Sequence, residues 1–449
     1  MQLAQKKVES TEQPKGMLEK IFKLSENGTT VKKEVLAGIT TFMTMAYILV
    51  VNPMILGDAG MDKGAVFMAT ALASVIATFV MAFLANYPMV LAPGMGLNAF
   101  FAYGVVLGMG YSWQFALAAV FIEGIIFIIL TFFNVREKII NAIPQTLKNA
   151  VTAGIGLFIA FIGLVGVGFI EAGGAILTLG NLKNPLALLA IFGIILTSVL
   201  LSKNVKGAFL IGMIGTSVIG MITGIVAAPK QFIDAPPSLS PIFMAFRHIP
   251  SSEIFSMDMV VVVFTFLFVD LFDTIGCLVG LASKADMLDE NENLPRAKQA
   301  LFADAIGTTA GAMLGTSTVT VFVESASGIA EGGRTGLTAF TAGMLFLVST
   351  LFAPIFTSIP SQATAPVLIL VGVMMASSLL KIDFNDFTEA IPAFLTVIMM
   401  PLAYSIAEGL VFGIVSYTAI KLLTGKKHEI QPTLYVLSLL FILKYGLAG

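Results

Sequence analysis

Long apolar stretches of similar length follow one another along most of the chain. A membrane crossing by an α-helix needs about 20 predominantly apolar residues. Regular stretches near that length occur at 35–56, 65–86, 111–133, 147–170, 185–202, 205–227, 257–281, 297–314, 336–356, 363–380, 388–405 and 407–424. Two less regular stretches occur at 88–108 and 315–331. The pattern predicts about fourteen crossings of a bilayer, with a short interfacial helix at 433–447.

The composition agrees with a polytopic membrane protein. Of the 449 residues, 57% are hydrophobic and 12% are charged, about half the charge of a soluble protein. The basic residues are dispersed, so nucleic acid is not an expected partner. One cysteine, Cys277, and two histidines in separate polar segments give neither a disulfide nor a metal-ligand cluster, and no cofactor is expected.

The distribution of lysine and arginine predicts the orientation in the membrane. Residues 1–33 are polar and rich in lysine, without the pattern of a signal peptide. With this segment in the cytoplasm, the predicted outside loops hold only Lys63, Lys183, Lys230 and Arg247. We therefore expect a multi-pass protein of the cell membrane with both termini in the cytoplasm.

Two similar segments suggest an internal repeat. "NAIPQTLKNAV" opens the fifth predicted crossing and "TSIPSQATAPV" opens the twelfth. An odd number of crossings separates them, so the two repeats run in opposite directions through the membrane, as in secondary transporters. The predicted parts are listed along the chain: a cytoplasmic segment 1–33, a first repeat 34–227, a proline-rich outside loop 228–256, a second repeat 257–425, and a cytoplasmic tail with a short helix 426–449.

The two irregular stretches lie at matching places in the repeats. The first, "YPMVLAPGMGLNAFFAYGVV", contains prolines and glycines that interrupt a helix before Ala99. The second begins "GTSTVTVFV", which is β-branched and aromatic and favours a strand, with a helix predicted from Glu324. Strands exposed to lipid leave backbone groups unpaired, so we expect the two strands to pair inside the protein. Each then ends at a half-helix whose N-terminus favours a polar ligand.

Acidic residues inside the apolar stretches are the main candidates for a site. "FVDLFDTIGC" places Asp270 and Asp273 at i and i+3, on the same side of a helix. A charged aspartate at the bilayer centre costs about 2.5–3.5 kcal/mol, which indicates a polar interior site or a proton carrier. Internally bonded packing residues are the alternative. Glu324 begins the second half-helix, and Asn98 holds the matching place in the first; helix-start and N-cap roles are the alternatives.

Other polar and aromatic residues are weaker candidates. Thr318 is a candidate ligand contact, although hydroxyl residues in membrane interiors more often satisfy backbone groups. Phe100 is a candidate for stacking on a planar ring, with packing as the default role. Glu123 and Asp304 are more simply read as hydrogen-bond partners between helices. The chain has no phosphate-binding GxxxxGK[ST] loop, so an ion gradient is the expected energy source.

Four motifs resemble one known family. "GITTFMTMAYILVVNP", "LAPGMGLNAFFAY", "FVDLFDTIGCLVGLASKADMLD" and "VESASGIAEGGRTGLTAF" look like the azaguanine-like purine permeases, over residues 17–425. These belong to the nucleobase–cation symporter superfamily, with the uracil and xanthine permeases. The resemblance implies an all-α polytopic fold of two inverted seven-helix repeats, with short strands in the third and tenth segments. It also implies a core domain of segments 1–4 and 8–11 and a gate domain of segments 5–7 and 12–14.

The resemblance further implies a transporter, not an enzyme, that imports hypoxanthine, guanine or adenine with protons. Asp270 and Asp273 match the carboxylate positions of the eighth helix, Glu324 matches the glutamate that grips the base, and Asn98 matches the polar residue of the third segment. The uracil branch has a histidine where this chain has Cys277, which leaves the proton route open and directs attention to Asp270. The hypothesis is that Glu324 and one aspartate hold the base while the other aspartate carries the proton.

Two other classes of function are weighed against this one. An anion–proton symporter of the same architecture does not need carboxylates at the midplane. A Mg²⁺-dependent membrane transferase is suggested by "DLFD" and by "DMLD" at 286–289, but the first lies within an apolar stretch. The sequence leaves open the preferred purine, proton or sodium coupling, rocking or elevator motion, and whether the chain forms a homodimer.

Overall fold

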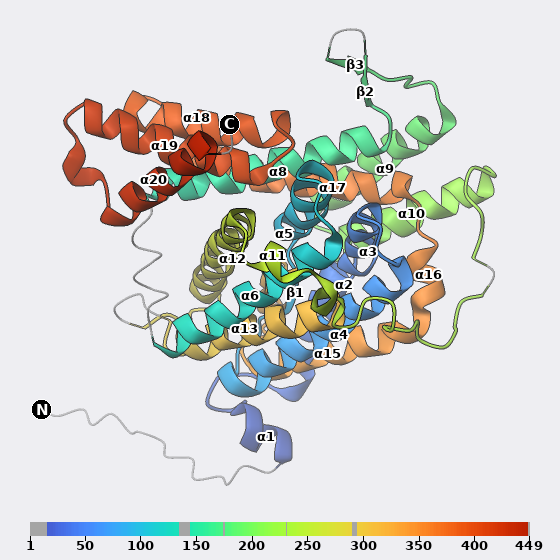
Figure 1. The fold of residues 1–449 in the computed structure, drawn as a ribbon. Coiled ribbons are helices and arrows are strands. Elements are labelled where there is room, and N and C mark those ends of the chain that lie inside the picture. Colours follow the sequence, from blue (N-terminus) through green and yellow to red (C-terminus); the bar gives the residue numbers. More distant parts are fainter. Residues whose placement is uncertain (1–15, 134–143, 174–175, 230, 290–293, 448–449) are drawn as a thin grey trace, which may run out of the picture.

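The structure is a computed structural model that describes residues 16–133, 144–173, 176–229, 231–289 and 294–447. Helices dominate it, and the strands are short (Figure 1). In the described residues, nine helices are long and apolar enough to cross a membrane. They are Val31–Asp58 (α2 and α3), Lys63–Ala85 (α4 with a π-helical end), Trp113–Phe132 (α6), Gln145–Gly166 (α8), Pro185–Ser202 (α9), Met257–Lys284 (α12), Gly336–Thr357 (α15 and α16), Ser361–Lys381 (α17 with a 3-10 end) and Ile406–Leu423 (α19).

The remaining predicted crossings are shorter or interrupted. Three further apolar helices span Met95–Gly108 (α5 and the π-helical η2), Ala208–Ile222 (α10) and Phe387–Leu402 (α18). Helix α13 spans Ala297–Leu314, and the half-helix α14 spans Ser325–Ala330. Every apolar stretch predicted from the sequence therefore corresponds to a helix or to a strand with a half-helix, and the predicted fold class is confirmed.

The two irregular segments pair with each other as predicted. Strand β1 (Leu91–Pro93) lies antiparallel to β4 (Val319–Val321), with Ala92 opposite Thr320. Both strands are buried. Since each strand supplies the backbone partner that lipid lacks, two interrupted segments far apart in sequence meet in the interior. Half-helices α5 and α14 follow directly from the two strands.

The helices pack in two groups. Helices α8, α9, α10, α17, α18 and α19 contact one another extensively, with α8 against α17 the largest contact. A second group includes α2, α4, α6, α12, α13 and α15. In Figure 1, α8, α18 and α19 lie above, and α4, α13 and α15 lie below. The predicted boundaries of the repeats and of the core and gate domains stay predictions.

The two Ile-Pro segments precede two helices that pack against each other. Pro144 precedes α8 and Pro360 precedes α17, both with extended ψ values. Proline favours this position because a missing N–H and a fixed φ cost nothing where a helix begins. The matched motifs therefore begin the two helices that form the closest pair in their group.

The structure differs from the prediction in the connection that follows α8. The crossing predicted at 147–170 ends at Gly166, and a small hairpin follows, of β2 (Ile170–Ala172) and β3 (Leu177–Leu179). The remaining short helices are α1 (Met17–Phe22), η3 (Ala245–His248), α11 (Ser251–Ile254), η6 (Lys427–Glu429) and α20 (Pro432–Leu447). The helix α20 corresponds to the short helix expected at 433–447.

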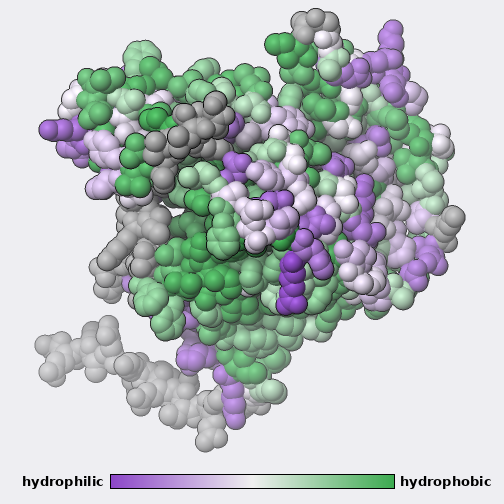
Figure 2. Space-filling model, viewed as in Figure 1, coloured by the Kyte–Doolittle hydropathy of each residue, from purple (hydrophilic) through white to green (hydrophobic). Residues whose placement is uncertain are grey.

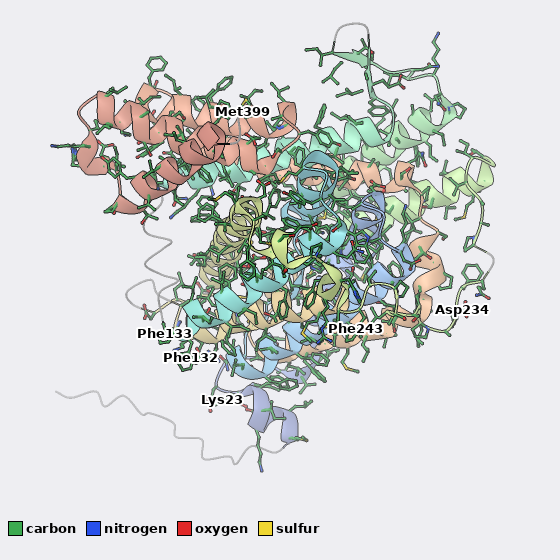
Figure 3. The ribbon with its side chains drawn as sticks, in the orientation of Figure 1. Lys23, Phe132, Phe133, Asp234, Phe243 and Met399 are labelled. Atoms are coloured by element: carbon green, nitrogen blue, oxygen red, sulfur yellow. The ribbon has the colours of Figure 1, made fainter. Side chains whose placement is uncertain are left out.

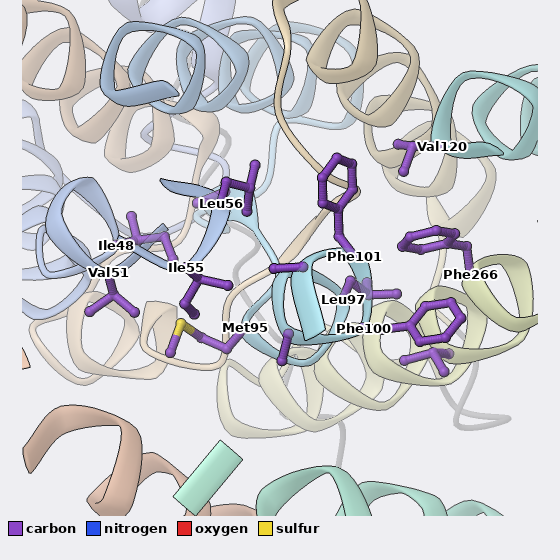
Figure 4. Close-up of a cluster of buried hydrophobic side chains, with 14 of the residues drawn as sticks. Ile48, Val51, Ile55, Leu56, Met95, Leu97, Phe100, Phe101, Val120 and Phe266 are labelled. Carbon is purple, nitrogen blue, oxygen red and sulfur yellow. The ribbon is translucent and has the colours of Figure 1, made fainter. Parts of the chain in front are cut away.

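Apolar side chains fill the interior and also cover much of the outside. Phe100 and Phe101 are fully buried, and Figure 4 places them among the side chains of α3, α5 and α12. On the outside, apolar residues spread over the helical faces (Figure 2). Phe132 and Phe133 at the end of α6 are more than half exposed and lie at the periphery (Figure 3). An apolar exterior of this extent is the surface expected of a protein solvated by lipid.

Candidate functional site

A cavity of about 680 Å³ lies between the two groups of helices. One wall comes from α12, the β4–α14 segment and the start of α5. The opposite wall comes from the first turns of α8 and from the end of α17. Its volume is within the range of pockets that hold small organic ligands. A site between two bodies also has walls that separate or approach when the bodies move.

Two carboxylates face this cavity. Asp273 projects from the middle of α12, and Glu324 precedes the half-helix α14. The hydroxyl of Thr320, on β4, lies 3.5 Å from an Asp273 carboxylate oxygen. The strand pairing therefore brings a residue of the second interrupted segment to α12, and both acids line the same cavity.

Tyr47 orients Glu324. Its hydroxyl donates a hydrogen bond to Glu324 Oε1 at 2.6 Å. Tyr47 lies in the break between α2 (Val31–Met45) and α3 (Ile48–Asp58), so its side chain reaches the cavity from the first crossing. This hydrogen bond fixes one carboxylate oxygen of Glu324, and because the carboxylate is rigid it also sets the direction of the other oxygen.

The start of the first half-helix completes this end of the cavity. Gly94, Met95 and Gly96 line it. A Cβ at Gly96 would lie 2.6 Å from Cγ2 of Ile155 on α8. Glycine at this position therefore permits the close approach of the half-helix to the opposite wall.

Three lysines also line the cavity. Lys284 lies in the last turn of α12, Lys148 in the first turn of α8, and Lys381 at the end of α17. The Lys148 ammonium lies 5.2 Å from the centre of the Phe272 ring. Lys284 follows Asp273 by eleven residues on α12, which is about 16 Å along the helix axis. We therefore call the part of the cavity at Asp273 and Glu324 its acidic end, and the part at the last turn of α12 its basic end.

Asp270 does not line the cavity, although it is one turn from Asp273. It is fully buried, and the Thr274 hydroxyl lies 3.1 Å from an Asp270 carboxylate oxygen and 2.6 Å from one of Asp304 on α13. Residues at i and i+3 differ by about 60° around a helix. This difference directs Asp273 into the cavity and Asp270 toward α13, so the structure does not bring the two aspartates to one site.

The other predicted residues lie behind the strands. Ser317 donates to the side-chain oxygen of Asn98, and Asn98 donates to the Pro93 carbonyl at 3.4 Å. Thr318 donates to a Glu123 carboxylate oxygen at 2.6 Å. The first contact ties α5 to the segment before β4, and the second ties that segment to α6; neither Asn98 nor Thr318 lines the cavity.

Phe100 lies within the hydrophobic core. Its ring meets that of Phe266 edge to face, with centroids 4.8 Å apart, as Figure 4 also shows. It does not line the cavity. Phe322, which sequence reasoning did not select, is an aromatic residue that does. Its position after a strand rather than on a helix gave no periodic signal.

Tyr47 was also missed from the sequence. A tyrosine within an apolar crossing needs a hydrogen-bond partner for its hydroxyl, which is a signal in itself. The partner could not be named because Glu324 is far away along the chain. Among the described residues, no group of three or more histidine, cysteine, aspartate or glutamate side chains is arranged to hold a metal ion.

Comparisons with known proteins identify the family. Residues 32–412 match the family model Xan_ur_permease, described as a permease family. The chain belongs to this permease family. It is 53% identical to a putative permease of Methanocaldococcus jannaschii, over 95% of this chain and 98% of that protein. It is 49% identical to the guanine/hypoxanthine permease PbuG of Bacillus subtilis (94% and 98%), and 44% identical to the adenine permease AdeP of Escherichia coli (96% of each).

Solved structures agree in fold. The permease resembles the transmembrane domain of the cyanobacterial bicarbonate transporter BicA with a TM-score of 0.65 at 17% identity, over 85% of this chain and 97% of that one. It resembles the murine anion transporter Slc26a9 in its inward-facing state with a TM-score of 0.60 at 10% identity, over 94% and 73%. At these identities the likeness concerns the fold alone. The family predicted from the motifs is confirmed, and its members are transporters rather than enzymes.

Proposed function

We propose that this permease imports purine bases, guanine or hypoxanthine and alternatively adenine, together with protons. The observation that carries the proposal is the pair of carboxylates, Asp273 and Glu324, at one end of an interior cavity. Relatives named guanine/hypoxanthine and adenine permeases, 49% and 44% identical, support a purine as the substrate.

The acidic end suits the edge of a purine. Guanine presents an N1–H and an exocyclic N–H side by side in the plane of the ring. One carboxylate accepts both, and hydrogen bonds to an ionised acceptor are about twice as strong as neutral ones. Glu324, oriented by Tyr47, takes this role, and Asp273 accepts a further N–H. Phe322 contributes an aromatic face beside them.

Proton coupling uses a second group of carboxylates. Asp270, one turn from Asp273 on α12, shares Thr274 with Asp304. A proton at Asp270 favours the conformation in which two acids lie close together, because like charges repel in a medium of low dielectric. Since α12 also carries Asp273, a change in its position reaches the base. In this proposal Asp270 carries the proton, and Asp273 and Glu324 hold the base.

The basic end of the cavity indicates its side of the membrane. Cytoplasmic segments are enriched in lysine and arginine. Lys148, Lys284 and Lys381 all belong to segments that the sequence assigns to the cytoplasm. We infer that the structure is an inward-facing state in the cell membrane, with both termini in the cytoplasm.

Uptake in a permease-deficient bacterium tests the proposal. Labelled guanine, hypoxanthine, adenine and uracil are supplied with and without a protonophore, and expression is checked in the membrane fraction. Purine uptake that the protonophore abolishes is the expected result. Purine uptake that survives the protonophore and requires sodium would show that sodium, and not the proton, is the coupling ion. If no base is taken up, the proposal that a purine is the substrate would be wrong, and an anion–proton symporter would be favoured.

A further inference from the structure

The three lysines of the cavity have no carboxylate partner in the part of the chain that the structure describes. Within the described residues, neither Lys148, Lys284 nor Lys381 forms an ion pair. Elsewhere the chain does pair lysines, as Lys426 does with Asp386 at 2.7 Å. The same cavity thus holds two acids and three lysines that form no ion pair within the described residues, and such a cluster of cations favours an anionic group.

The volume of the cavity exceeds what a free base occupies. Pockets of a few hundred to about 1,000 Å³ enclose drug-sized ligands, whereas a purine base is only two fused rings. With its hydrogen-bonding edge on Glu324 and Asp273, a base leaves the basic part of the 680 Å³ cavity to something else. The occupant that matches both ends carries a purine at one end and an anion at the other.

The placement of the lysines argues for more than the usual charge of cytoplasmic loops. Lys148 is half-buried, and its ammonium lies against the Phe272 ring, next in sequence to Asp273, whereas Lys284 and Lys381 are exposed. Lys284 comes from α12 on one wall, whereas Lys148 and Lys381 come from α8 and the end of α17 on the other. A phosphate held by lysines of both walls would tie the two groups of helices together.

We propose that purine nucleoside monophosphates bind this cavity from its basic side and inhibit transport. The inference rests on the proposed function, because it places the base where the transported purine binds. The phosphate then lies among Lys148, Lys284 and Lys381. Such a ligand is the product of the class of reaction that joins an imported base to a ribose phosphate, so its binding constitutes feedback by product on import.

Inhibition follows from the geometry. A ligand that bridges both walls is bound in the inward-facing arrangement alone, and differential affinity for one state shifts the population toward it. The doubly charged phosphate is also not stabilised by the acidic end of the cavity, so the nucleotide does not pass with the base.

Competition binding to the purified full-length permease tests the inference. Labelled guanine is bound to the protein in detergent and displaced with guanosine monophosphate, guanosine, ribose 5-phosphate or inorganic phosphate. Charge-assisted contacts predict that guanosine monophosphate displaces guanine at about tenfold lower concentration than guanosine. Ribose 5-phosphate and phosphate are expected not to displace it at that concentration.

Substitution of the three lysines separates phosphate recognition from other effects. In K148Q/K284Q/K381Q, the affinity for guanosine monophosphate is expected to fall to that for guanosine. The ratio of the affinity for the nucleotide to the affinity for guanine is the readout. The matched control, K32Q/K183Q/K203Q, removes three exposed lysines outside the cavity and keeps the wild-type ratio. In proteoliposomes, the nucleotide is expected to inhibit only from the side that exposes the cavity lysines.

Several outcomes would overturn the inference. These are displacement by the nucleotide no better than by guanosine, an unchanged ratio in the cavity triple variant, or displacement by ribose 5-phosphate alone as strong as by the nucleotide. A wild-type protein that binds no guanine would instead remove the proposed function. The guanine binding curve therefore distinguishes the two failures.

Discussion

Replacing Glu324 by glutamine removes the central acceptor of the proposed base site while keeping its shape. Glutamine retains one oxygen, which can accept from Tyr47 as Glu324 Oε1 does at 2.6 Å. Its NH₂ group replaces the other oxygen and faces an N–H of the base, so one charge-assisted hydrogen bond is lost. Such a bond contributes about 1.5–3 kcal/mol, which corresponds to about a 10- to 150-fold increase in the Kd for guanine.

Equilibrium binding of labelled guanine to purified protein at neutral pH measures this change. Glu331→Gln is the matched control, since Glu331 caps the other end of α14 and pairs with Lys206 outside the cavity. Tyr47→Phe removes only the orienting donor and leaves both Glu324 oxygens for the base, so its effect on binding is indirect and is expected to be about tenfold or less, which is about 1.4 kcal/mol. Guanine binding by Glu324→Gln within twofold of wild type, in folded protein, would refute the reasoning.

Three further predictions concern coupling, closure and pH. Asp270→Asn is expected to bind guanine but not to accumulate it against a gradient; accumulation measured in proteoliposomes with a proton gradient would contradict the proton role. Tyr404 packs edge to face on Phe158, with centroids 5.4 Å apart, a contact worth about 0.5–1.5 kcal/mol. Tyr404→Ala is therefore expected to loosen the side of the cavity away from the lysines and to slow maleimide labelling of Cys277, which lines the cavity. Unchanged labelling would contradict this role of Tyr404 in closing the cavity. The ammonium of Lys421 lowers the pKa of Glu429, so this contact stabilises the fold above the ordinary glutamate pKa of about 4.3 and is lost as the pH falls through the lowered value. After correction for the intrinsic exchange rate at each pH, the α20 amides are expected to be less protected from hydrogen exchange at pH 3.5 than at pH 6, and Glu429→Gln should remove the difference.

The crossings and the interrupted segments were predictable because local patterns determine them. Apolar length gives the crossings, and the prolines and β-branched residues of 88–108 and 315–331 give the strands. The pairing of β1 with β4 followed from the cost of unpaired backbone in lipid. The hairpin of β2 and β3 was missed since a short exposed hairpin has too few residues for a periodic signal.

The site was only partly predictable. Spacing alone placed Asp270 and Asp273 on one side of a helix, but the direction of each depends on what packs against α12. Asn98 and Thr318 carry the polarity expected of a site, yet their partners, Ser317 and Glu123, lie on other elements. Contacts across more than a hundred residues decide which polar side chain faces the cavity, and a single sequence does not contain them.

A structure of the permease with guanine bound tests the central claim most directly. Ligand density between Asp273 and Glu324, with N–H edges within about 3 Å of both carboxylates, is the predicted result. Density at Asp270, or a saturated protein with guanine bound outside this cavity, would contradict it.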